Sequence, residues 1–172
     1  MHHFALWLAQ TRASLAIQTN LWVIPTVQSF HIAGIGIVMA SVFMMDLRIL
    51  GWAGQDQTLS QTARRFGPWM WGALTVLLCT GILMVIGEPV RELMSLAFWL
   101  KMSMLTIGIF TAILFQRALS RNEREWEQSR VHLRSTRFLA MLTFLVWFSV
   151  IFLGRLIAYD SVWGRWSLMP VN

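Results

Sequence analysis

The chain has 172 residues, of which 56% are hydrophobic and only 13% are charged. A soluble domain usually carries about 25% charged residues, so this composition excludes an ordinary soluble domain and indicates a membrane protein. The net charge is +6, but the arginines cluster beside apolar stretches, as topology signals do, so we expect no nucleic acid as a partner.

The first predicted element is an amphipathic helix over residues 3–18 that lies in the membrane interface. Phe4, Trp7 and Leu15 are among its apolar residues, while Gln10 and Arg12 are among its polar ones. A cleaved signal is not expected, because the segment lacks a basic leading region and a small-residue cleavage site after an apolar core.

Four later stretches each reach the roughly 20 apolar residues needed to cross a bilayer. They run over about residues 21–45, 68–87, 93–116 and 138–158. Each is expected to be helical, because a backbone in lipid has to satisfy its own hydrogen bonds. The prediction is therefore an all-α integral membrane four-helix bundle with an amino-terminal interfacial helix, forming one membrane domain over residues 1–172.

The connections add expectations about packing. Residues 88–92 form a short link containing Pro89, which predicts a tight turn and makes the second and third spans antiparallel neighbours. The charged third connection predicts helices that continue beyond the membrane, supported by pairs such as Arg121 with Glu125. Near the inner end of the first span, Asp46 is expected to pair with Arg64 or Arg65.

Positive charge predicts the orientation. Nine of the 14 Lys and Arg residues fall on the side of the first and third connections, and five fall on the other. The richer side should be cytoplasmic, which places both termini on the periplasmic side of a bacterial inner membrane. Tryptophans flank the spans as interfacial belts, with Trp22 and Trp99 at the outer boundary and Trp52, Trp69 and Trp71 at the inner one.

The first span, residues 21–45, contains His31 but no Asp, Glu, Lys or Arg. An ionisable side chain in hydrocarbon is costly and by default marks a functional site. Imidazole is the usual axial ligand of haem iron. Gly34, one turn away, either makes room for a flat ligand or lets another helix approach closely. The alternative is a structural or proton-handling histidine, oriented by Gln28.

A second ligand has to lie at the same depth. With about 1.5 Å of rise per residue, Met84, Lys101 and Met102 fall near the level of His31, and no other histidine does. A His/Met pair, a five-coordinate iron and a haem shared between two copies all stay open, although methionines also serve as core filler. Cys79, the single cysteine, is interpreted as a packing residue.

Arg155 is the other unusual charge, near the outer end of the fourth span. Its guanidinium is a partner for Glu88, for Asp160 or for a haem propionate. The alternative is that its long side chain reaches the interface without binding a ligand.

Several runs of sequence resemble one family. The run from His31 to Gly36, followed by that from Asp46 to Gly51, is similar to the first-helix signature of small bacterial four-helix membrane proteins catalogued as a domain of unknown function. The stretches 68–71, 80–81, 98–101 and 154–159 resemble later helices of that family. The resemblance covers nearly the whole chain and implies a four-helix integral membrane protein without an established activity. Members often carry a histidine near the end of the third helix, where this chain has Gln116.

The leading hypothesis is a b-type haem subunit that transfers electrons beside membrane or periplasmic redox partners. Its cofactor-binding residues are His31, the iron ligand, with Gly34, Met84, Met102 and Arg155. The alternative is a non-catalytic accessory or assembly subunit, in a larger complex or a homo-oligomer, with a structural His31. A third hypothesis is a small transporter that uses His31 as a relay, and a bound quinone or lipid near His31 also stays open. Without a catalytic constellation, enzymatic activity of the chain alone is not expected.

Overall fold

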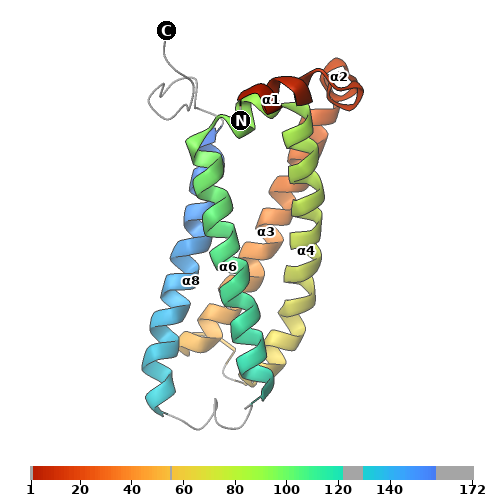
Figure 1. Ribbon diagram of the computed structural model, residues 1–172. Coiled ribbons are helices and arrows are strands. Elements are labelled where there is room, and N and C mark those ends of the chain that lie inside the picture. The colour runs from red at the N-terminus through yellow and green to blue at the C-terminus, as the bar shows by residue number, and fades with distance from the viewer. Residues whose placement is uncertain (1, 55, 122–129, 158–172) are drawn as a thin grey trace.

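The computed structural model describes residues 2–54, 56–121 and 130–157, and this part of the chain contains seven helices and no strand (Figure 1). Four of the helices are long and apolar enough to cross a membrane: α3 (Val23–Leu50), α4 (Leu59–Gly87), α6 (Leu96–Arg121) and α8 (Arg130–Ile157). The predicted all-α, four-helix membrane architecture is confirmed. The chain is a multi-pass membrane protein whose apolar outer surface requires a lipid bilayer.

The second long helix starts earlier than its apolar stretch. The hydroxyl of Thr58 accepts from the backbone N–H of Gln61 at 3.1 Å, and the Gln61 side chain accepts from the N–H of Thr58 at 3.0 Å. This capping box starts α4 at Leu59, so Pro68 lies inside the helix. By contrast, Pro25 falls in the first turn of α3, where its missing N–H leaves no intrahelical bond unmade.

The amino-terminal segment is two short helices rather than the one predicted over residues 3–18. They are α1 (His2–Ala9) and α2 (Arg12–Thr19), and the Thr11 hydroxyl caps α2 by accepting from the N–H of Ser14 at 3.3 Å. Both lie across the end of the bundle where α4 meets the short helix α5 (Pro89–Leu93) (Figure 1). Phe4 and Trp7 stay exposed there, as suits a helix at a membrane interface.

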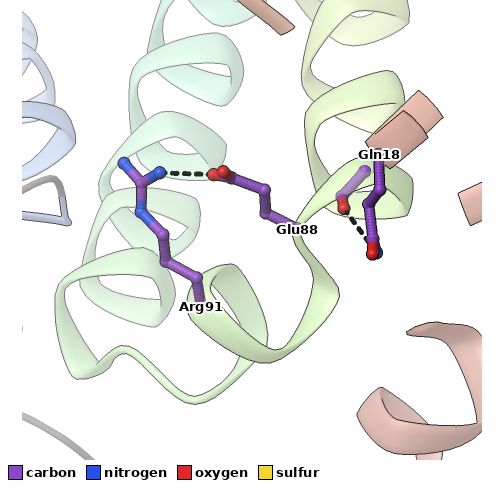
Figure 2. A network of polar contacts seen from close by, with 4 residues as sticks. Gln18, Glu88 and Arg91 are labelled. Atoms are coloured by element: carbon purple, nitrogen blue, oxygen red, sulfur yellow. Dashed lines mark hydrogen bonds and ion pairs between the residues drawn. The ribbon is translucent and has the colours of Figure 1, made fainter. Parts of the chain in front are cut away.

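Gln18 joins α2 to the end of α4. Its side-chain nitrogen donates to the carbonyl oxygen of Gly87 at 3.0 Å and to the Ser14 hydroxyl at 2.9 Å. Figure 2 shows this contact beside the ion pair between Arg91 and Glu88. The Gly87 carbonyl is one of the last four of its helix, which lack intrahelical partners, so the contact satisfies a group that would otherwise need water.

The four long helices pack as two pairs. α3 packs along α4, α6 packs along α8, and α3 also contacts α8, whereas α4 and α6 touch little. The expected tight turn after α4 is wrong, because α5 occupies this connection, with Pro89 at its first position. The second and third spans are antiparallel as expected, but they are not closely packed neighbours.

Gly34 sets the distance between α3 and α4. A Cβ at this position would lie 3.1 Å from Cδ2 and 3.2 Å from Cγ of Leu77. Gly34→Leu should therefore force the helices apart and reduce the free energy of unfolding by roughly 1–3 kcal/mol, seen as a lower midpoint of thermal unfolding in detergent. Gly72→Leu is the matched control, because a Cβ at Gly72 meets nothing within 4 Å. Equal midpoints for both variants would contradict the prediction.

Candidate functional site

A cavity of about 510 Å³ lies between the two helix pairs and is lined by all four long helices and by Glu92 of α5. Its volume is within the range of about 300–1,000 Å³ typical of small-molecule sites. The walls are mostly apolar. Leu78 and Ile82 of α4 line it and are nevertheless 64% and 52% exposed, so the cavity reaches the outer surface of the bundle that faces lipid.

The cavity brings together three of the five predicted cofactor residues. His31, Met84 and Met102 line it, whereas Gly34 and Arg155 do not. Gly34 packs against Leu77 instead, and Arg155 is exposed on α8. Lys101, expected at the depth of His31, also lines the cavity.

Of the two carboxylates expected to pair with Arg155, the structure describes only Glu88. Glu88 forms an ion pair with Arg91 (Figure 2). Asp160 lies outside the described residues, as does the Glu125 expected to pair with Arg121.

His31 is held by a hydrogen bond to the neighbouring helix. Its Nδ1 lies 2.7 Å from Oγ1 of Thr80, and that oxygen lies 2.8 Å from the carbonyl oxygen of Val76. A hydroxyl has one proton, and a threonine inside a helix commonly donates it to the carbonyl four residues earlier. Thr80 then accepts from Nδ1–H, which leaves a lone pair on Nε2. Within the described chain Nε2 has no hydrogen-bond partner.

Two residues of this arrangement were missed in the sequence. The orienting partner of His31 is Thr80 and not Gln28. Space beside the ring is left by Gly81, where a Cβ would lie 3.8 Å from Cε1 of His31. The adjacent pair Thr80-Gly81 inside an apolar span was the available signal, since a small polar residue next to a glycine marks a helix surface that another helix approaches.

Glu92 and Lys101 form the charged lining of the cavity. Glu92 is only 6% exposed. The side chain of Lys101 packs against α8, because its Nζ would lie 3.5 Å from a Cβ placed on Gly154. Burial raises the pKa of the Glu92 carboxyl above its ordinary value of 4.5, and the cations Lys101 and Arg91 offset only part of this effect. Among the described residues the two groups form no ion pair with each other.

The raised pKa of Glu92 predicts how stability changes with pH. The folded chain holds this proton more tightly than the unfolded chain, so the free energy of unfolding falls as the pH rises above about 4.5. Glu92→Gln should remove this loss of stability and raise the midpoint of thermal unfolding at mildly alkaline pH relative to the wild type. The measurement compares midpoints at mildly acidic and mildly alkaline pH. Glu88→Gln, which breaks an exposed ion pair, should produce no such gain; a gain from both would refute the assignment.

A hydrogen bond beside the cavity links α4 to α6. The indole N–H of Trp71 donates to Oε1 of Gln116 at 3.0 Å, and Trp71 lines the cavity. The Trp71 side chain is therefore turned toward the cavity, while Trp69 beside it is 67% exposed. Gln116, at the position where the resembled family often has histidine, faces a tryptophan and not His31.

Asp46 does not form the ion pair expected for it. It is 6% exposed, and its Oδ2 is buried without a hydrogen-bond partner. The expected partners Arg64 and Arg65 are exposed on α4, whereas Asp46 lines a separate small cavity together with residues of α6 and α8. The prediction fails because Asp46 points toward the second helix pair and not toward the first turns of α4.

Comparisons with known proteins complete the description. Residues 18–160 match the sequence model of a family of unknown function (DUF6644). No curated protein and no solved structure matches the chain. Among the described residues, no three His, Cys, Asp or Glu side chains are grouped so that they hold a metal ion.

Proposed function

The chain belongs to this family of unknown function (DUF6644), and from its cavity we propose that it binds haem b and transfers electrons within the membrane. In this proposal His31 would bind the haem iron. The observation that carries it is the hydrogen bond between His31 and Thr80, which fixes the ring and leaves Nε2 available. Histidines that bind a metal almost always hold their other ring nitrogen in such a bond.

The cavity also suits a large flat cofactor. Its apolar walls match a porphyrin, and Gly81 leaves space next to the imidazole of His31. Met84 and Met102 supply thioether sulfurs as candidate second ligands, and a His/Met pair raises the reduction potential of haem iron. Among the described lining residues, Lys101 is the cation. It would therefore pair with the haem carboxylates, as the sequence suggested for Arg155.

The chemistry would be divided between cofactor and protein. The haem supplies a one-electron change at iron. The protein residues hold it: His31 binds the iron, Thr80 fixes the tautomer of His31, and the apolar walls limit access of water.

The same proposal includes a location. Arginines gather at the end of the bundle where α3 and α6 finish, represented by Arg48, Arg64, Arg65 and Arg117. Because positive charge favours the cytoplasmic side, α1, α2 and α5 would lie on the periplasmic side of a bacterial inner membrane. A redox partner would then dock in the membrane or from the periplasm, near the end that holds Glu92.

The deciding experiment is a visible absorption spectrum of the protein, expressed with a haem supply and purified in detergent. A Soret band, with a change between oxidised and reduced samples and near one haem per chain, is expected. Protein that stays colourless after haem addition would overturn the proposal. If such protein is isolated with other membrane subunits, the accessory-subunit alternative with a structural His31 is favoured. A quinone or lipid identified by mass spectrometry would assign the cavity to that ligand.

A further inference from the structure

The small cavity beside Asp46 has features of a binding site. Its volume is about 50 Å³, and residues of α3, α4, α6 and α8 line it. On the same measure of volume, a cavity needs roughly 10–15 Å³ to hold one water molecule. The cavity therefore has room for a small number of water molecules and for no organic ligand.

Two residues that line this cavity each carry a buried polar atom without a hydrogen-bond partner in the described part of the chain. One is the acceptor Oδ2 of Asp46 and the other is the donor Nε1–H of Trp147, in side chains that are 6% and 3% exposed. Unpaired buried polar groups of this kind are rare and costly. Water can accept from an indole N–H and donate to a carboxylate, so water molecules in the cavity would satisfy both kinds of atom, whereas a metal cation would satisfy only the carboxylate.

Hydroxyl groups complete the polar lining. Thr111 and Thr143 line the cavity, and the Thr111 hydroxyl donates its proton to helix carbonyls, at 3.0 Å from Ile107 or 2.9 Å from Gly108. Its oxygen therefore keeps lone pairs that accept a hydrogen bond from water.

No charge in the lining compensates Asp46. It is the only titratable residue among the described residues that line the cavity. The nearest cation along its own helix is Arg48, whose Nε donates to the carbonyl oxygen of Gln57. On the other helices, Arg64 and Arg65 of α4, Arg117 of α6 and Arg137 of α8 do not line the cavity. An isolated carboxylate in such a place is strongly disfavoured relative to the neutral acid.

We propose that this cavity is an internal site for water and one proton, with Asp46 as the group that binds the proton. Binding forms one O–H bond on the Asp46 carboxylate and converts it to the neutral acid; the proton comes from solvent water. Ionisable residues inside a membrane span commonly serve proton transfer. The inference does not depend on haem, because it rests on the orphaned atoms of Asp46 and Trp147 alone.

Infrared difference spectroscopy between acidic and alkaline samples tests the proposal on protein reconstituted into lipid. The wild type should show the C=O stretch of a protonated carboxylic acid, shifted by exchange into D2O. The spectra are recorded in a Glu92→Gln background, because the buried Glu92 carboxyl has a raised pKa and gives a band of the same kind. In this background Asp46→Asn should lose the signal. Asp56→Asn should retain it, because Asp56 is exposed at the same end of the bundle. Trp147→Phe should shift the band, since the water then loses its donor, and this second variant decides the test if Asp46→Asn does not fold.

Two results would overturn the proposal. One is an unchanged carboxylic acid signal in Asp46→Asn. The other is a band that responds to Na⁺ at constant pH, which would assign the cavity to a cation. Failure of the haem proposal has a separate readout, because Asp46→Asn should leave the visible spectrum in place.

Discussion

His31→Ala is expected to abolish the Soret band of the purified protein. The substitution removes the only imidazole that the described residues place at the cavity, and neither Met84 nor Met102 replaces it, because a thioether is a weaker ligand for haem iron than imidazole. The measurement is the ratio of Soret absorbance to protein concentration. Imidazole added to the His31→Ala protein should restore part of the band, since the vacated space can hold the free ligand.

His3→Ala is the control for His31→Ala. His3 is an imidazole exposed on α1, far along the chain from the cavity, so its loss should leave the band unchanged. Thr80→Val should give an intermediate result: His31 stays, but the bond that fixes its ring is lost, and such second-sphere losses weaken binding by roughly 10- to 100-fold. A full band in His31→Ala, with a wild-type unfolding midpoint, would refute the assignment of the ligand.

Gly81→Leu is expected to prevent cofactor binding while the bundle stays folded. Gly81 lines the cavity, and a Cβ there would lie 3.8 Å from Cε1 of His31, which is ordinary van der Waals contact. The Cβ therefore fits, but the branched end of a leucine would fill the space beside Nε2. We expect loss of the Soret band together with a thermal unfolding midpoint close to that of the wild-type protein without cofactor.

Gly36→Leu is the matched variant for Gly81→Leu. It makes the same change in a membrane-spanning helix, at a position where a Cβ meets nothing within 4 Å and which does not line the cavity. It should bind haem as the wild type does. If both variants keep the band, the cofactor does not lie beside His31; if both lose it, the loss reflects the helices and not the cavity.

The sequence was sufficient for the architecture, because length and polarity alone identify a helix that crosses a bilayer. It was also sufficient to single out His31, since an imidazole among some 20 apolar residues is conspicuous. The break after residue 9 is not predicted, although Thr11 is a residue type favoured at helix N-caps and its hydroxyl caps α2. The apolar residues on both sides of Thr11 favour one continuous helix over the break.

The contacts between helices were harder to predict. A span that is apolar on all sides carries little information about which face turns inward. The pairing of His31 with Thr80, the packing of Gly34 on Leu77 and the inward position of Trp71 all depend on the rotation of α4 about its axis. The environment of Asp46 likewise depends on how the second helix pair meets the first. These features follow only from the assembled bundle.

The large cavity reaches the lipid-facing surface at Leu78 and Ile82, and this affects how its affinity for a ligand should be expressed. An oily molecule dissolved in the bilayer meets this opening while diffusing in two dimensions, without first crossing into water. Occupancy then follows the mole fraction of ligand in the membrane and not its aqueous concentration, and adding detergent or extra lipid dilutes the ligand and lowers occupancy at a fixed total amount. Dissociation constants for this protein should accordingly be expressed per lipid molecule.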